Sequence, residues 1–130
     1  MASIFSKIIA GEIPAYKIAE DDHYYAFLDI QPLSLGHTLV VPKQEVDYIF
    51  DLEESTYIGL QLFAKSVAER LKKAFPGKRI GVAVIGLEVP HAHIHLIPFS
   101  KVEEMNFSNK KLNLSKEEFV AIAEKIKSAN

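Results

Sequence analysis

The stretch that decides the fold is Val89-Pro90-His91-Ala92-His93-Ile94-His95-Leu96-Ile97-Pro98. Histidines alternate with apolar residues, and a period of two is typical of a β-strand whose two faces differ. The faces are His91, His93 and His95 on one side, and Ala92, Ile94 and Leu96 on the other. We expect the apolar face to pack into a core. Pro98 has no amide hydrogen, so it should mark the end or an edge of the strand.

Three interpretations of the histidine face follow from the residues alone. An ordinary solvent-exposed strand face is disfavoured, because no Lys, Thr or Glu occurs among the histidines. A zinc site is a second interpretation, but the first and third rings lie about 13 Å apart on a strand while zinc–nitrogen bonds are about 2.1 Å. The third is phosphate chemistry, in which one imidazole is the nucleophile and the others bind oxygens or pass protons.

The composition limits the class of protein. A length of 130 residues with 48% hydrophobic residues fits one domain with a real core. The net charge of −2 argues against a surface that coats nucleic acid, and the absence of cysteine excludes disulfides and thiolate chemistry. There is no long apolar run and no signal-peptide pattern. These features predict a soluble cytoplasmic protein without a membrane partner.

The first half of the chain predicts a short helix and three strands. Ser3 is a plausible cap for a helix with an apolar stripe, and Gly11 should end it. Residues 16–20 and 24–28 read as a hairpin, with His23 exposed in its turn. Residues 37–41 form a third strand, of the buried type.

The second half predicts two helices around two strands. Asp51 and Glu54 have the spacing of a capping box for a helix of about 23 residues. Its apolar stripe consists of Leu60, Ala64, Val67, Leu71 and Ala74. Residues 79–85 and the histidine strand follow, and then a polar loop over 100–114 that could cover a site. Ser115 and Glu118 form another capping box, before a stripe of Phe119, Ile122, Ala123 and Ile126.

The segment 91–97 resembles the histidine-triad signature of the HIT superfamily, in which three histidines alternate with apolar residues. Residues 4–14, 26–30 and 36–42 are similar to the Hint-like branch. The resemblance implies an α+β, HIT-like fold with an antiparallel sheet of about five strands, one long helix and short terminal helices. It implies one domain over residues 1–130, with a core over 1–100 and a C-terminal loop and helix over 101–130. It also implies a homodimer.

The resemblance further implies a nucleotidyl hydrolase or transferase. His93 would attack the α-phosphate of a nucleoside phosphoramidate or a related conjugate and form a covalent nucleotidyl-histidine. His91 and His95 would orient the ring and stabilise the phosphate, and His37 would complete the network. The ligand is a purine nucleotide or nucleotide conjugate, not a nucleic acid, and the scheme needs neither a metal nor a cofactor. The nucleotide-binding residues would be Asp29, Ile30, Phe27, Phe5, Ile8 and Val89.

Asp29 and the loop before the triad leave alternatives open. Asp29 could accept from two ribose hydroxyls or simply cap the loop that follows it. Leu87 stands where much of the Hint-like branch has a glutamine, and Glu88 stands where we expect a hydroxyl residue or another acid. Leu87 cannot donate a hydrogen bond, and Glu88 would repel a phosphate. A nucleotide-binding regulatory module with little turnover therefore stays an alternative, as does a zinc-dependent hydrolase.

Overall fold

The computed structural model of the chain describes residues 2–129. Its helices are α1 (Ile4–Ile9), α2 (Glu54–Ala74) and α3 (Lys116–Lys127), with 3-10 turns η1 (Ile49–Asp51) and η2 (Val102–Met105). Its strands are β1 (Lys17–Glu20), β2 (Tyr24–Leu28), β3 (Thr38–Pro42), β4 (Arg79–Ala83) and β5 (Ile94–Phe99). They form one antiparallel sheet in the order β1-β2-β3-β5-β4. The predicted α+β class, with a five-stranded sheet and one long helix, is confirmed.

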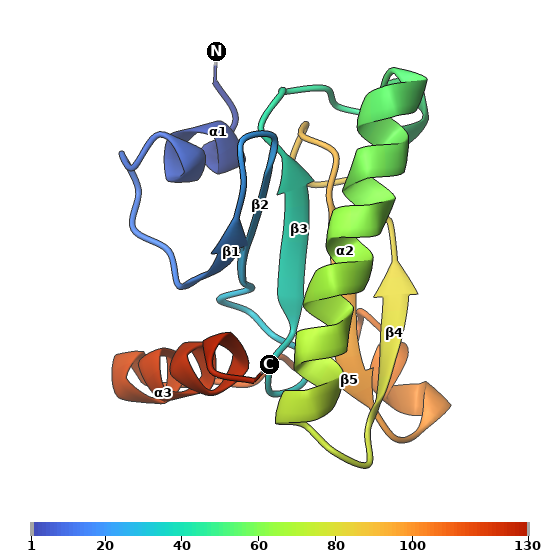
Figure 1. Cartoon of the computed structure of the whole chain (residues 1–130). Helices are drawn as coiled ribbons and strands as arrows, with labels where there is room; N and C mark the ends of the chain where they lie inside the picture. The colour runs from blue at the N-terminus through green and yellow to red at the C-terminus, as the bar shows by residue number, and fades with distance from the viewer. Residues whose placement is uncertain (1, 130) are drawn as a thin grey trace.

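The sheet separates two apolar clusters. α2 lies over one face and runs roughly along the strands (Figure 1), and that face contributes Ala26, Leu28, Val40, Ile94 and Leu96 to the main core. The opposite face carries the smaller cluster, made of Phe5, Ile8, Tyr25, Phe27, Leu39 and Val41, and α1 lies against it. Side chains alternate between the faces of a strand, so His95 lies on the side of the smaller cluster, opposite Ile94 and Leu96.

The long helix follows its predicted stripe but not its predicted start. Leu60, Ala64, Val67, Leu71 and Ala74 are all buried, as expected. The expected capping box of Asp51 and Glu54 is wrong, because the residue before the helix is Glu53, whose side chain makes no capping bond. Asp51 belongs to the separate turn η1, and its amide donates to the Tyr48 carbonyl. A local turn therefore overrides the cap pattern.

The histidine strand starts later than predicted, while Pro98 lies near its end, as expected. β5 begins only at Ile94. The reason is that the His91 amide donates to the Val89 carbonyl and the Ala92 amide donates to the Val46 carbonyl, so neither amide is bonded to a neighbouring strand. Ala92, Ile94 and Leu96 still pack into the main core, as expected. β5 continues through Pro98, beyond the last pairing with β3 at Leu96. Proline is tolerated there, and its carbonyl accepts from Ser34 Oγ at 2.7 Å.

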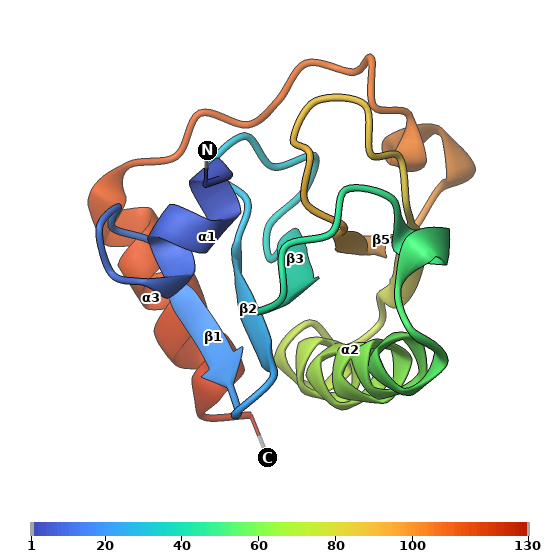
Figure 2. The same cartoon turned by 90° about the horizontal axis from the view of Figure 1, so that it is seen from above.

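The C-terminal helix belongs to the same packed body. α3 starts with the predicted capping box of Ser115 and Glu118. Phe119, Ala123 and Ile126 are buried in the main core, and Phe119 stacks on Tyr16. The segment that leads to α3 runs along the side of the sheet opposite α2 (Figure 2, orange). Among the described residues, no helix has both the length and the apolar character needed to cross a membrane.

Candidate active site

Strand register brings four histidines to one side of the sheet. Leu39 pairs with His95, so His37 lies diagonally across from His95 on the same face. The rings of His93 and His95 have centroids 5.0 Å apart, and those of His37 and His95 5.2 Å. His91 lies at the other end of the row, where the Phe5 ring contacts both His91 and His93 edge-on. The predicted residues His37, His91, His93 and His95 are therefore neighbours.

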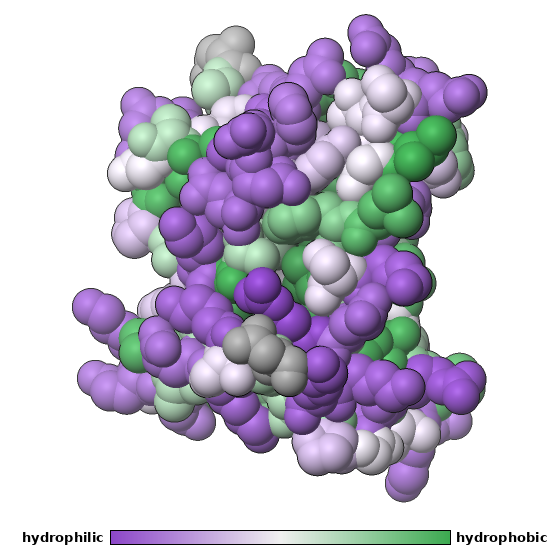
Figure 3. All heavy atoms as spheres, in the orientation of Figure 1, coloured by the Kyte–Doolittle hydropathy of each residue, from purple (hydrophilic) through white to green (hydrophobic). Residues whose placement is uncertain are grey.

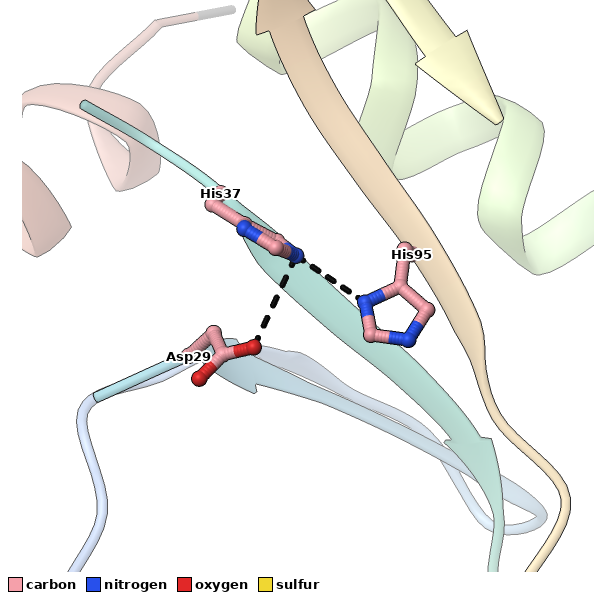
Figure 4. Close-up of side chains that lie close together, drawn as sticks. All are labelled: Asp29, His37 and His95. Atoms are coloured by element: carbon pink, nitrogen blue, oxygen red, sulfur yellow. Dashed lines mark hydrogen bonds and ion pairs between the residues drawn. The ribbon is translucent and has the colours of Figure 1, made fainter. Parts of the chain in front are cut away.

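The hydrogen bonds of His37 fix where its ring proton lies. The Leu33 amide donates to His37 Nδ1 at 3.0 Å, so this nitrogen is an acceptor without a hydrogen. A neutral imidazole then carries its hydrogen on Nε2. His37 Nε2 lies 3.0 Å from His95 Nδ1 (Figure 4), to which it donates. His95 Nδ1 is consequently an acceptor, and the hydrogen of His95 is on Nε2.

His93 is held by a main-chain group. Its Nδ1 lies 2.8 Å from the His91 carbonyl oxygen, which can only accept, so Nδ1–H donates. The lone pair of a neutral His93 is then on Nε2. His93 is buried, but the structure gives Nε2 no protein partner among the described residues. Of the three triad rings, His93 is the one whose unprotonated nitrogen is left to react.

Asp29 lies directly beyond β2, beside His37. Its Oδ1 accepts from the Gln31 amide at 2.9 Å, which is the capping bond expected of a loop-starting aspartate. Its Oδ2 lies 3.6 Å from His37 Nε2 (Figure 4). The second oxygen therefore keeps acceptor capacity, and the two interpretations of Asp29 are compatible.

Burial sets the charge of this cluster. It lowers the pKa of His37 to about 4, with help from the Lys111 charge. It lowers the pKa of His95 to about 3, with His93 and His37 adding to the effect. Burial also lowers the pKa of His91 and raises that of Asp29. At neutral pH the rings of His37, His91 and His95 are thus uncharged, as the hydrogen-bond pattern requires.

We expect the buried His37 to make the fold acid-sensitive. Its pKa is about 4 in the folded protein against an ordinary value of 6.5, so the unfolded chain takes up the proton first as pH falls. The free energy of unfolding should therefore fall between about pH 6.5 and 4, with about 2 kcal/mol already lost at pH 5 through this residue. Urea unfolding at pH 7.5 and 5 measures the loss. His37→Asn should lose correspondingly less than wild type, and equal losses would contradict this expectation.

The same protonation pattern decides whether a metal fits here. Asp29, His37 and His95 offer one ligand atom each, all within 4.8 Å of one another. A metal at His37 Nε2 would have to displace the hydrogen that this nitrogen carries, because Nδ1 already accepts from Leu33. Metal-bound histidines instead donate from their other ring nitrogen. The three side chains therefore fit a hydrogen-bond relay and do not fit a metal as they stand.

Most apolar residues expected to bind nucleotide gather beside the triad. Phe5, Ile8 and Phe27 are buried in the smaller cluster, and Val89 packs against it. Ile30, by contrast, has a side chain 70% exposed, in the loop after Asp29. Leu87 is 87% exposed and Glu88 is also exposed, so neither residue is packed into the site.

Two neighbours of the triad lie in the C-terminal loop and were not singled out from the sequence. The Phe107 ring contacts His95 edge-on at 4.8 Å between centroids and His37 at 6.2 Å. Lys111 donates to the Phe107 and Asn109 carbonyls, and its charge helps lower the pKa of His37. Phe107 is the single aromatic residue between 101 and 114, which was the available signal. The predicted covering loop thus contacts the relay.

Known proteins are similar to this chain in sequence and in fold. The family model of the HIT domain matches residues 10–102. The adenosine 5′-monophosphoramidase hnt1 of Schizosaccharomyces pombe is 32% identical over 130 residues, covering 98% of each chain. The adenosine 5′-monophosphoramidase HNT1 of Saccharomyces cerevisiae is 38% identical over 98 residues, covering 75% of this chain and 62% of the yeast protein.

A solved structure agrees with these sequence matches. The crystal structure of a Hit-like protein involved in cell-cycle regulation from Bartonella henselae superposes with a TM-score of 0.85 at 32% identity, covering 98% of this chain and 96% of that one. The fold and the row of histidines define a histidine-triad protein. The chain belongs to the HIT family.

Proposed function

We propose that this protein hydrolyses nucleoside phosphoramidates or related nucleotide conjugates at the α-phosphate through a nucleotidyl-His93 intermediate. The observation that carries the proposal is the Nε2 of His93, which has no partner within residues 2–129 while the Nδ1 hydrogen is tied to the His91 carbonyl. Two relatives named adenosine 5′-monophosphoramidase support the reaction class. A nucleophile of this kind splits one difficult hydrolysis into two easier displacements.

The proposed steps balance with water as the second reactant. His93 Nε2 attacks phosphorus, the bond from phosphorus to the amine nitrogen breaks as that nitrogen takes up a proton from solvent, and a nucleotidyl-histidine forms. Water then displaces the histidine, releases a proton to solvent and yields the nucleoside monophosphate. His95 Nε2–H lies beside His93 and stabilises the charge that develops in both steps, because the relay from His37 fixes this tautomer. In this scheme both nitrogens of His91 are used inside the protein, so His91 orients rather than contacts the phosphate.

The test follows amine release from an adenosine phosphoramidate that carries a fluorescent amine, with EDTA present throughout. Release by wild type supports a reaction that needs no metal. Measurable binding of adenosine monophosphate without release of any leaving group would instead favour the regulatory nucleotide-binding module. Amine release that occurs only without EDTA would instead favour the zinc-dependent hydrolase.

Asp29 should set the preference for ribose. In the proposal its Oδ2 accepts from the vicinal hydroxyls, and a hydrogen bond to a charged group contributes about 1.5–3 kcal/mol. We expect Asp29→Ala to raise KM for the adenosine substrate about 10- to 100-fold with little change in kcat. A 2′,3′-dideoxy substrate provides the control, because wild type should bind it weakly and the variant should not distinguish it from the ribo form. If Asp29→Ala still preferred the ribo substrate over the dideoxy substrate as strongly as wild type does, the ribose hydroxyls would have to bind a group other than Asp29.

The proposal includes a homodimer joined through β4 and α2. β4 is an edge strand, and Val82, on this strand, is 62% exposed. Ile58 and Leu62 on the adjoining α2 are 50% and 63% exposed. Hydrophobic surface also shows along the α2 side of the molecule (Figure 3). A second copy related by a two-fold axis would pair the edges and cover these side chains.

The cytoplasmic location expected from the sequence stays a prediction.

A further inference from the structure

A second polar network lies behind the triad, on the side of α1. The Glu45 carboxylate, in the loop after β3, accepts through Oε1 from the Ser3 amide at 2.7 Å and from Ser6 Oγ at 2.6 Å. These two bonds hold the pKa of Glu45 low, at about 2, so it is a carboxylate at every pH of interest. Glu45 therefore fastens the first turn of α1 to the end of β3.

Ser3 connects this anchor to the triad. Its Oγ accepts from the Ser6 amide at 3.0 Å and lies 2.8 Å from His91 Nδ1. His91 Nε2 lies 2.8 Å from the Pro42 carbonyl, which can only accept, so Nε2 carries the hydrogen of the neutral ring. His91 Nδ1 is consequently the acceptor, and the Ser3 hydroxyl donates to it. Both residues are buried, with Ser3 7% and His91 0% exposed.

We infer that Ser3 and Glu45 are positioning residues for His93, an assignment that rests on the proposed function and adds two residues to it. Glu45 holds Ser3, and Ser3 fixes the His91 ring from the α1 side. The carbonyl of His91 in turn holds His93 Nδ1 at 2.8 Å. Phe5, between Ser3 and Ser6, packs edge-on against both imidazoles, with centroids 5.8 Å from His91 and 5.0 Å from His93. The first turn of α1 thus determines where the nucleophile sits.

A helix cap alone does not account for this arrangement. Capping uses only the acceptor side of the Ser3 hydroxyl, which receives the Ser6 amide. Its donor side is directed at a buried histidine 88 residues away, which at 2.8 Å is nearer than Ser6 Oγ at 3.3 Å. Ser115 makes the same cap for α3, accepting from the Glu118 amide in a capping box. Within the described chain Ser115 makes no bond to a histidine, so it is a matched control for loss of a cap without loss of positioning.

The experiment compares Ser3→Ala, Ser3→Thr, Glu45→Gln and Ser115→Ala. Nitrogen NMR of the imidazole rings reads tautomers and hydrogen bonding, and steady-state kinetics on the adenosine phosphoramidate reads turnover. We expect Ser3→Ala to move the His91 Nδ1 and His93 ring resonances and to lower kcat about tenfold, with KM changed less than about twofold. Ser3→Thr should restore both readouts. Glu45→Gln, which keeps an acceptor oxygen, should lose less than Ser3→Ala.

Ser115→Ala should leave the histidine resonances and kcat unchanged, although it loses a helix cap. The inference is overturned if Ser3→Ala leaves the His93 resonances in place, or if it lowers kcat no more than Ser115→Ala does. Absence of amine release by wild type would reject the proposed function instead. The ring resonances would then still decide whether Ser3 positions His93, since they require no turnover.

Discussion

Substituting His93 by alanine should abolish amine release, with a fall in kcat of about 10⁴-fold or more. The reason is specific to the ring nitrogens, because His93 Nε2 is the nitrogen of the triad that has neither a hydrogen nor a partner in the part of the protein that the structure describes. The rings of His91 and His95 cannot replace it. His91 uses both nitrogens within the protein, and His95 carries its hydrogen on Nε2.

The measurement has two arms. Rapid acid-free quenching of wild type during turnover, followed by mass spectrometry, should find a nucleotidyl group added to His93. The variant should show no adduct, while its affinity for adenosine monophosphate should stay within about threefold of wild type, because uniform binding is retained. A variant that keeps more than a tenth of the turnover would show that another group attacks the phosphate.

Replacing His95 by leucine has the second largest expected effect. Leucine fills similar space beside Phe107 but removes both the Nε2–H donor and the acceptor for His37. We expect kcat to fall about 10²- to 10³-fold, the range found when one donor to a developing charge is removed. The nucleotidyl adduct should still form on His93, only more slowly.

Glutamine at position 95 is the control for this change. Its amide supplies an N–H donor and a carbonyl acceptor, so it should recover part of the activity that leucine loses. The comparison separates hydrogen bonding from packing against Phe107. If the two variants were equally slow, the contribution of His95 would lie in its ring shape and not in its donor.

Local patterns predicted the two faces of the histidine segment but not the residue at which its strand begins. Alternation placed Ala92, Ile94 and Leu96 in the core correctly, because burial of one face is a property of neighbouring residues. The start of β5 depends on a bond from the His91 amide back to Val89, which alternation does not encode. Asp51 does not cap α2 for a similar reason, because it belongs to the separate turn η1.

The rest of the candidate site depends on contacts between distant segments. The bond between His37 and His95 joins residues 58 apart and requires the pairing of β3 with β5. The resemblance to a known family pointed to His37, but no local pattern assigned its tautomer, which depends on the Leu33 amide. Phe107 and Ser3 reach the triad from opposite ends of the chain. Their contributions follow from tertiary packing alone.

The acceptor that orients the proposed nucleophile, His93, is the peptide carbonyl of His91, and this affects how the protein tolerates mutation. A carboxylate in the same place could be lost by one point mutation or neutralised by acid. A main-chain oxygen is present whatever residue occupies position 91, and it does not titrate. If His93 is the nucleophile, a substitution at position 91 changes where its ring lies, while the hydrogen bond that fixes its tautomer comes from the backbone and is kept.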